Sequence, residues 1–330
     1  MMRLNPEGLL RFKQADRFEA TYAGGEANVA VSLANYGIDT KFITKLPDHE
    51  IGQCAVNSLR QFGVNTSDIV MGGGRLGIYF VEKGASQRAS KVIYDRANSS
   101  IACATETDFD WNKIFEGAEW FHFTGITPAL GGDLPAICLQ ACKVAKSLGI
   151  TISCDLNFRS KLWPRDKACQ VMSELMPYVD VCIANELDAE DVFGIKALHS
   201  DIDAGELHYE AYISVAKQLV ERFQLKICAI TLRGSISASE NNWAGMLFDG
   251  SSAYFSKTYN IKIVDRVGGG DSFGGALIYA LLSQYSGQEA IDFAAAASCL
   301  KQTIEHDYNL VSVEEVQALV SGSGSGRVQR

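Results

Sequence analysis

The sequence predicts an α/β fold in three layers, in which helices cover both faces of a mainly parallel sheet. The first observation is a regular alternation of helical and strand-like segments that begins near residue 27. The second is that short, uniformly apolar runs separate several of the helical segments. Strands that alternate with helices need crossover connections, which place the strands parallel and bury both faces of the sheet.

The helical and strand segments follow from two different apolar patterns. Helices are predicted where apolar residues recur at helical spacing, over 27–36, 51–62, 133–148, 166–176, 209–223, 272–285, 288–302 and 312–320. Strands are predicted at the short apolar runs AEWFHFTG (118–125), ITISCDLN (150–157), VDVCIANE (179–186) and KICAITLRG (226–234). Together these segments supply the three layers.

Two stretches depart from this alternation. Residues 8–22 (GLLRFKQADRFEATY) and 76–96 (LGIYFVEKGASQRASKVIYDR) have the pattern of strand, turn and strand, and the second alternates apolar and polar residues around KGASQRAS. Both are too polar for central parallel strands. We therefore expect a small antiparallel sheet, formed by about 8–22 and 74–98, that projects from the main body.

Length and composition are those of an ordinary globular enzyme. The chain has 330 residues, of which 47% are hydrophobic and 21% charged. No internal repeat and no clear linker divides it, so we expect one domain over 1–330. Residues 321–330, which include SGSGSGR, are expected to be a flexible tail.

The net charge limits the kinds of partner that the protein is expected to bind, and the cysteines indicate the cellular compartment in which it is expected to occur. A net charge of −9 argues against nucleic acid or an anionic membrane as the main partner, while leaving room for a small anionic ligand beside a few converging cations. No apolar run is long enough for a membrane span, and no signal peptide is recognised at the start. The nine cysteines are scattered, with Cys138 and Cys142 the closest pair, so we expect reduced thiols in a cytoplasmic protein.

Polar residues end several of the predicted strands. Asp155, Asn157 and Arg159 follow one run, Asn185 ends the next, and Arg233 ends the last. In open α/β sheets, ligands bind beyond the carboxyl ends of the strands, so these side chains predict a binding rim. The alternative is that they are helix caps and turn residues.

The segment DRVGGGD (265–271) places three glycines and a carboxylate immediately before an apolar helix. Backbone amides at such a helix start bind anions, so a phosphate there would be repelled by Asp271 unless the carboxylate has its own task. One task is a simple N-cap. The other is to accept the proton of a substrate hydroxyl that attacks a γ-phosphoryl group, while the glycine amides hold the transferred charge.

Two familiar nucleotide-binding motifs do not occur in the sequence. It contains neither G-x-x-x-x-G-K-[ST] nor an early G-x-G-x-x-G, so a P-loop protein and a dinucleotide dehydrogenase are disfavoured.

Residues 265–271 resemble the D-T-x-G-A-G-D signature of the ribokinase-like (PfkB) carbohydrate kinases, and YAGGEANVA (22–30) resembles that family's substrate-side glycine motif. Within the family, RLNPEGLLRFKQADRFEATYAGGEANVAVSLA, YDRANSS and DLNFRSKLW resemble 2-keto-3-deoxygluconate kinases. The resemblance spans nearly the whole chain. It implies a single catalytic domain with an α/β/α core and a small β lid, in agreement with the two departing stretches.

The resemblance also implies roles for residues at the rim. Asp271 would be the general base, and Gly268, Gly269 and Gly270 would form the anion hole. Residues along the ATP would be Asn157, Thr231, Arg233, Gly234 and Ser235, with Gly268 and Gly270 at its phosphates. Asn185 matches the first residue of an N-x-x-E motif that positions Mg²⁺ through water, although the fourth position here is Asp188.

On the substrate side, Gly25 and Asn28 would contact hydroxyl groups. Tyr79, Tyr94 and Arg96 would close over the substrate from the lid, and Asp307 matches a further substrate-contacting aspartate. Members of the family open with a longer strand that carries Gly-Glu or Gly-Asp just before the equivalent of residues 2–4. We therefore expect a shorter first strand here.

Two arginines favour an acidic sugar over a neutral one, because arginine binds carboxylates in a planar, bidentate fork. Arg159 ends a core strand and Arg96 ends a lid strand. Arg159 is also expected to act in catalysis, where it would stabilise charge on the transferred group together with the glycine amides. The alternatives are an exposed edge charge for Arg96, a salt bridge to Asp155 or Asp166 for Arg159, and plain packing for the lid tyrosines.

The sequence thus predicts an ATP- and Mg²⁺-dependent kinase that phosphorylates the terminal hydroxyl of a 2-keto-3-deoxy sugar acid. Two alternatives stay open: a kinase of a neutral sugar such as fructose or ribose, and a non-catalytic sugar sensor on the same scaffold. Since apolar residues occur in the lid sheet, we expect a homodimer, or a higher homo-oligomer, formed through it.

Overall fold

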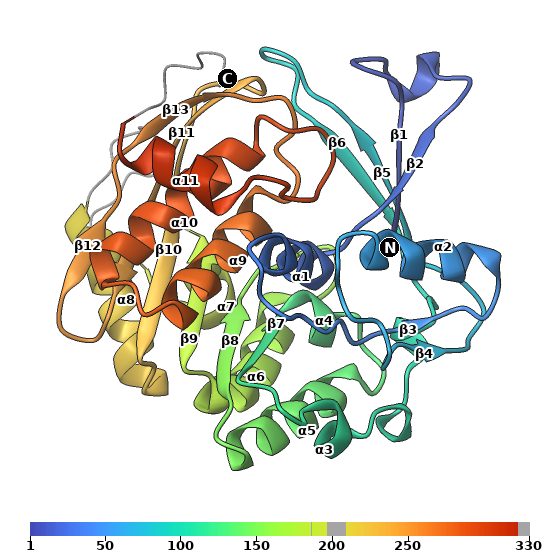
Figure 1. Ribbon diagram of the computed structural model, residues 1–330, viewed down its shortest axis with the longest axis horizontal. Coiled ribbons are helices and arrows are strands. Elements are labelled where there is room, and N and C mark those ends of the chain that lie inside the picture. The colour runs from blue at the N-terminus through green and yellow to red at the C-terminus, as the bar shows by residue number, and fades with distance from the viewer. Residues whose placement is uncertain (186, 197–208, 323–330) are drawn as a thin grey trace.

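The computed structural model describes residues 1–185, 187–196 and 209–322, and a large sheet runs through its centre (Figure 1). The strand order is β12-β11-β10-β9-β8-β7, and β13 pairs with β11. The strands are β7 (Trp120–Thr124), β8 (Thr151–Asp155), β9 (Val181–Asn185), β10 (Ile227–Ser235), β11 (Glu240–Phe248), β12 (Ala253–Phe255) and β13 (Tyr259–Lys262). Strands β7 to β10 are parallel, so their carboxyl ends meet at one edge.

Helices cover both faces of this sheet. One layer contains α1 (Gly25–Asn35), α9 (Gly269–Leu282), α10 (Gly287–Lys301) and α11 (Val313–Val320). The other contains α5 (Leu134–Ser147), α6 (Arg165–Leu175), α7 (Asp188–Phe193) and α8 (Tyr209–Phe223). The remaining helices are α2 (Glu50–Arg60), α3 (Trp111–Ile114), α4 (Ile126–Ala129) and four 3₁₀ turns, η1 (Phe12–Gln14), η2 (Ile101–Cys103), η3 (Glu106–Asp108) and η4 (Met176–Tyr178).

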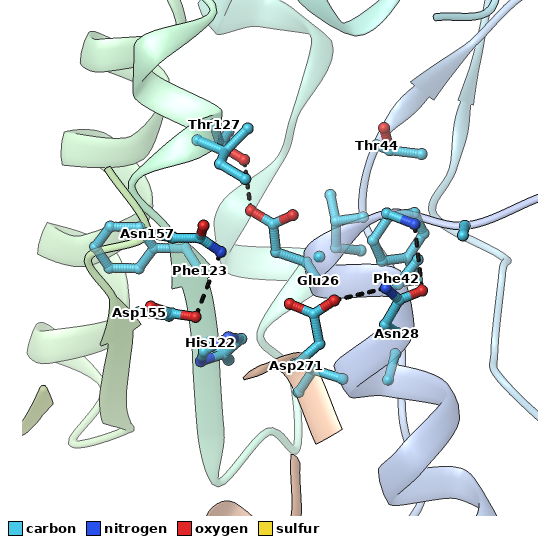
Figure 2. Close-up of a pocket in the computed structure, with 18 of the residues that line it drawn as sticks. Glu26, Asn28, Phe42, Thr44, His122, Phe123, Thr127, Asp155, Asn157 and Asp271 are labelled. Atoms are coloured by element: carbon cyan, nitrogen blue, oxygen red, sulfur yellow. Dashed lines mark hydrogen bonds between the residues drawn. The ribbon is translucent and has the colours of Figure 1, made fainter. Parts of the chain in front are cut away.

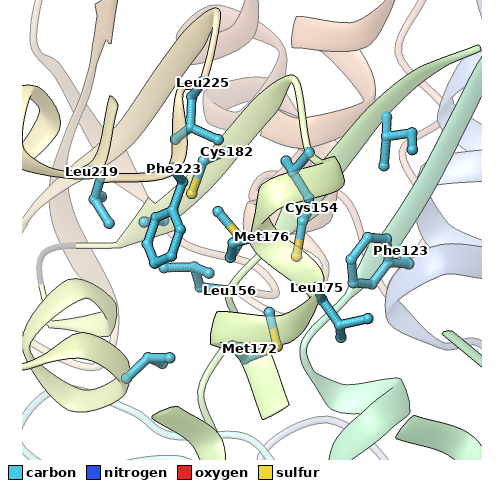
Figure 3. Close-up of a cluster of buried hydrophobic side chains, with 14 of the residues drawn as sticks. Phe123, Cys154, Leu156, Met172, Leu175, Met176, Cys182, Leu219, Phe223 and Leu225 are labelled. Atoms are coloured by element: carbon cyan, nitrogen blue, oxygen red, sulfur yellow. The ribbon is translucent and has the colours of Figure 1, made fainter. Parts of the chain in front are cut away.

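The side chains of β9 show why both faces are buried. Val181 and Ile183 pack into the core under α9 and α10, whereas Cys182 and Ala184 pack into the opposite core. Successive residues of a strand point to opposite faces, so a uniformly apolar run is what a doubly covered strand requires. Figure 3 shows the core on the α6 and α8 side, where Cys182 and Cys154 lie among leucine, methionine and phenylalanine side chains. The predicted three-layer α/β fold is confirmed.

A smaller, four-stranded sheet projects from the body in the order β2-β1-β5-β6 (Figure 1). Its strands are β1 (Met2–Asn5), β2 (Glu19–Tyr22), β5 (Ile78–Glu82) and β6 (Lys91–Asp95). Strand β1 is antiparallel to β2 and parallel to β5, while β5 and β6 form the expected hairpin. The short strands β3 (Lys45–Leu46) and β4 (Val70–Met71) form a separate parallel pair.

The expected strand–turn–strand over 8–22 was wrong. Only its last part is a strand, and its partner is Met2–Asn5, which we had expected to be a shortened first strand. The segment between them is held as a loop by Glu82, whose carboxylate accepts hydrogen bonds from Arg11 Nε at 2.6 Å and Phe12 N at 2.9 Å. These bonds replace the strand pairing that the pattern suggested.

The eight predicted helices are present within a few residues of their expected bounds, and so are the four predicted core strands. Not predicted were β11, β12 and β13 and the short helices α3, α4 and α7. Residues 323–330 of the expected tail lie outside the described residues. Across the described parts of the chain, no helix is both long enough and apolar enough to cross a membrane.

Candidate active site

A cavity of about 1330 Å³ lies at the carboxyl ends of β7 to β10, between the large sheet, the small sheet and the start of α9. Most residues predicted for the site line it: Gly25, Asn28, Tyr79, Tyr94, Arg96, Asn157, Arg159, Asn185, Asp188, Thr231, Arg233, Gly268, Gly269, Gly270, Asp271 and Asp307. Gly234 and Ser235 are not among the lining residues. They lie further along β10 and pair with Asn242 and Asn241.

The glycine segment forms a turn that ends in the first residues of α9. Gly268 has φ +82°, in the left-handed region, and is the N-cap residue of the helix. A Cβ at this position would lie 2.1 Å from the carbonyl oxygen of Asp307, so only glycine fits. At Gly270 a Cβ would meet nothing within 4 Å. The turn therefore places the N-terminus of α9 at the cavity, although the amide of Gly269 also donates to Arg266 O at 3.3 Å.

Asp271 occupies the first turn of α9 and is not its N-cap. Its Oδ2 accepts a hydrogen bond of 2.6 Å from Asn28 Nδ2, which fixes the carboxylate beside α1 (Figure 2). The pKa of Asp271 is raised to about 6, chiefly by burial and also by the charges of Asp307 and Glu26, while the Asn28 hydrogen bond and Arg159 act in the lowering direction. A carboxylate with such a pKa is ionised at neutral pH and can accept a proton.

Arg96, which follows the end of β6, brings a buried guanidinium to the opposite wall. The residue is 8% exposed, and its guanidinium carbon lies 4.3 Å from the centre of the Tyr94 ring. Within the described residues it forms no ion pair, and its Nε has no hydrogen-bond partner. Burial, together with the charge of Arg159, lowers the pKa of Arg96. Two arginines therefore face the same region of the cavity.

A buried charge network joins the small sheet to the glycine turn. Arg3 of β1 donates to Asp307 Oδ1 at 2.7 Å and to Asp265 Oδ2 at 2.6 Å, and the arginine is fully buried. The hydroxyl of Tyr79 donates to Asp307 Oδ2 at 2.7 Å. Both carboxylate oxygens of Asp307 are thus occupied. This favours a role in holding Arg3 and Tyr79 over the direct substrate contact that we predicted.

The profile of the pfkB family carbohydrate kinases matches residues 7–308, which is most of the chain. The chain belongs to this family. The predicted family is therefore confirmed on both motif and fold.

Three similar proteins carry related names. A 2-dehydro-3-deoxygalactonokinase of Haloferax volcanii is 32% identical over 326 residues, covering 99% of this chain and 96% of its own. The crystal structure of a 2-dehydro-3-deoxygluconokinase from Thermotoga maritima shares 52% identity at a TM-score of 0.94, covering 98% of this chain and 96% of its own. A 2-dehydro-3-deoxygluconokinase of Thermoproteus tenax is 28% identical over 308 residues, covering 92% and 86%. The prefix 2-dehydro denotes the same group as 2-keto.

Two further carboxylates of this pfkB family chain lie at the site: Glu26 was not predicted, and Asp155 was predicted as part of the strand-end rim without a role of its own. Glu26 accepts hydrogen bonds from Thr124 N, Thr124 Oγ1 and Thr127 Oγ1, at 3.1, 2.8 and 2.6 Å, and so ties α1 to the end of β7. Asp155 ends β8, where burial and the charges of Asp188 and Asp271 hold its pKa well above the usual range. Figure 2 shows both carboxylates beside the space that Asp271 faces. Glu26 lies inside the glycine motif 22–30 and Asp155 at a strand end, so both signals were available in the sequence.

The two residues predicted for a metal are largely engaged with the backbone of this kinase. Asn185 Oδ1 accepts from Leu187 N at 2.8 Å and Asp188 N at 3.1 Å. Asp188 accepts from Phe158 N at 3.1 Å and Asn185 N at 3.0 Å. Over the ranges that the structure describes, no three His, Cys, Asp or Glu side chains cluster as a metal site. These groups fit a metal held through water and phosphate oxygens, and not a protein cage.

Proposed function

We propose that the protein transfers the γ-phosphoryl group of ATP to the terminal hydroxyl of a 2-keto-3-deoxy sugar acid. The observation that carries the sugar-acid assignment is Arg96: a buried guanidinium, beside Arg159, with no carboxylate partner among the described residues. An unpaired buried charge is costly, and the carboxylate of a ligand would relieve that cost. The names of the similar proteins support the same class of substrate.

In the proposed arrangement the sugar acid lies between the strand ends and the small sheet. Its carboxylate faces Arg96 and Arg159, and its terminal hydroxyl faces Asp271. Asp271 accepts the hydroxyl proton as the oxygen attacks the γ-phosphorus, and the bond between that phosphorus and the bridging oxygen of ADP breaks. The amides of Gly268 to Gly270 stabilise the charge on the transferred group.

ATP would lie along the ends of β8 and β10, beside Asn157, Thr231 and Arg233, with its phosphates at the glycine turn. It would contact Gly234 and Ser235 only where it extends beyond the cavity. The amide-lined turn at the start of α9 fits phosphate oxygens. Asn185 and Asp188 would position Mg²⁺ through water, and the metal would neutralise charge on the phosphates.

The small sheet would act as a lid over this arrangement. Tyr79 and Tyr94 lie opposite each other in the β5–β6 register, with ring centres 6.1 Å apart, and face the cavity with Arg96. Closure of these residues over the substrate would exclude water and suppress ATP hydrolysis. We also propose that two copies associate through the opposite face of this sheet.

A coupled assay of ADP release over 2-keto-3-deoxygluconate, 2-keto-3-deoxygalactonate, fructose and ribose tests the function. We expect turnover with one or both sugar acids and little with the neutral sugars. Turnover confined to fructose or ribose would establish the neutral-sugar alternative. Binding of a sugar, seen by calorimetry, with no ADP release from any of them would establish the sensor.

A further inference from the structure

A buried lysine lies directly beneath the glycine turn. Lys301 is the last residue of α10, and no part of it is accessible to solvent. Its Nζ donates to three backbone carbonyl oxygens, those of Asp265, Val267 and His306. An ammonium group has three N–H donors, so this set of carbonyls satisfies it completely without a carboxylate in contact.

The carbonyls belong to the segments that build the anion hole. Asp265 and Val267 directly precede Gly268, and His306 directly precedes Asp307, whose backbone packs against Gly268. The end of α10 supports the same turn twice more, because Ser298 Oγ donates to Gly269 O at 2.7 Å and Gln302 O accepts from Val264 N at 2.9 Å. The end of α10 therefore supports the turn through two neutral contacts and one positively charged group, Lys301.

A fully buried ammonium is costly unless its interactions repay that cost. Burial lowers the pKa of Lys301, whereas the charges of Asp265, Asp307 and Asp271 raise it. The C-terminal end of a helix also favours a cation. The three carbonyl oxygens around the ammonium group resemble the carbonyl cages that bind monovalent cations, in which carbonyl oxygens replace the hydration shell of the ion.

We propose that Lys301 is a positioning residue that serves as a built-in monovalent cation. It holds residues 265–268 and 306–307 in the shape that presents the glycine amides to a phosphoryl group. The inference deepens the proposed function and rests on it, since it assigns a support for the phosphoryl site of the same kinase. It predicts that turnover needs no added K⁺ or Na⁺.

The test compares the wild type with Lys301→Ala and with Lys257→Ala as a matched control. Lys257 Nζ also donates to backbone carbonyls, those of Leu319 and Val320, but at the surface. Each protein is assayed for ADP release, with the sugar that the wild type phosphorylates, in choline, sodium, potassium and ammonium chloride at equal ionic strength. The melting temperature is measured in the same four salts without sugar or ATP.

We expect wild type and Lys257→Ala to turn over equally in all four salts. Lys301→Ala should lose about 10²-fold in kcat in choline chloride, the size expected for a displaced oxyanion-hole donor, with a smaller change in KM for the sugar. Potassium or ammonium should enter the emptied cage, restore most of that kcat and raise the melting temperature of this variant alone.

The proposal is overturned by a wild type that needs K⁺, by a Lys301→Ala variant with normal kcat, or by a loss that no cation repairs in either measurement. If the variant does not fold in choline chloride, the wild-type salt series decides. The melting measurement needs no substrate. If added cations raise the melting temperature of the variant but the wild type has no kinase activity, the proposed function is overturned. The inference that the three carbonyls form a cation-binding cage would still stand.

Discussion

Asp271 lies among charges that determine when it can accept a proton. Its pKa of about 6 results mainly from burial, with Asn28 and Arg159 acting in the opposite direction. The carboxylate is thus ionised at neutral pH, yet is a stronger base than an exposed aspartate. We expect kcat/KM of the wild type to fall tenfold for each pH unit below about 6.

Asp271→Asn should separate turnover from stability. The variant keeps a group that can accept the Asn28 hydrogen bond but cannot take a proton, so we expect turnover to fall by about 10²- to 10⁴-fold with substrate binding retained. The pKa of Asp271 is higher in the folded than in the unfolded protein, so ionisation of its carboxyl group lowers the free energy of unfolding. This loss of stability is absent below about pH 4 and complete above about pH 6. The variant should therefore be more stable than the wild type at pH 8, on the order of 1–3 kcal/mol, and equally stable at pH 4. Urea unfolding at both pH values measures this, and a difference that does not change with pH would contradict the assigned pKa.

Arg96→Met tests the sugar-acid assignment, with Arg75→Met as its control. Arg75 also lines the cavity, but it is only partly buried and its charge is already paired with Asp95 at 2.8 Å. Removing the buried guanidinium should lower kcat/KM for the sugar acid by about 10²-fold or more and leave KM for ATP nearly unchanged. Arg75→Met should behave as the wild type. Equal losses for a sugar acid and a neutral sugar would show that Arg96 does not recognise the carboxylate.

At the residue scale, the sequence predicts a functional residue when the residues next to it in the chain already indicate its role. Gly268 to Asp271 form one uninterrupted motif, and Asp155, Asn157 and Asn185 come at strand ends, where a parallel sheet must bring them together. Lys301 could not be found in this way. A lysine at a helix end is usually solvated, and its burial depends on carbonyls from residues 265, 267 and 306 that only the tertiary fold brings to it.

At the scale of elements, Gly268 and Gly270 at the start of α9 differ in whether the backbone conformation and the surrounding space allow a side chain. Gly268→Ala would force a Cβ to within 2.1 Å of Asp307 O at a positive φ, so we expect a loss of stability on the order of 2–4 kcal/mol. Gly270→Ala finds open space in an ordinary helical position, so its stability should be equal or slightly higher, while its methyl group should raise KM for ATP. Thermal unfolding and ADP-release kinetics of the pair check this. Equal destabilisation of both would show that the turn has another shape.

The elements that the sequence could predict are those with a uniform pattern. The apolar runs of β7 to β10 are buried on both faces and could be recognised directly. Strand β11 could not, because its first residues, Glu240, Asn241 and Asn242, are polar, and nothing in the sequence shows that they pair with β13. The loop over 8–18 was taken for a strand because nothing in its own sequence shows that Glu82, far along the chain, binds Arg11 and Phe12.

At the scale of the whole molecule, the two sheets are joined through charge and not only through packing. Arg3 belongs to the small sheet, whereas Asp265 and Asp307 flank the glycine turn, and all three are buried. Any movement of the small sheet over a substrate therefore acts on the segments that carry the anion hole. This connection gives substrate closure a physical route to the phosphoryl site.

The outer face of the small sheet carries the last prediction, that two copies associate there. Phe80 and Ile93 are directly opposite in the β5–β6 register and point away from the face that carries Tyr79 and Tyr94. Phe12 and Phe18 both pack edge-on against Phe80, and Ile93 remains 52% exposed. Apolar side chains are therefore exposed on this sheet, which projects from the body of the molecule (Figure 1). An exposed apolar patch on a sheet is a usual place for self-association.

Ile93→Lys should place a charge in the centre of that contact and convert the dimer to a folded monomer. Ile51→Lys is the control, because Ile51 is 43% exposed on α2, outside the small sheet. Sedimentation velocity at several concentrations, with circular dichroism to verify folding, distinguishes the two variants. A wild type that sediments as a monomer, or an Ile93→Lys variant that stays dimeric, would place the contact elsewhere. If the monomer keeps its kcat, closure of the small sheet is a property of each chain, since Arg3, Asp265 and Asp307 all belong to one copy.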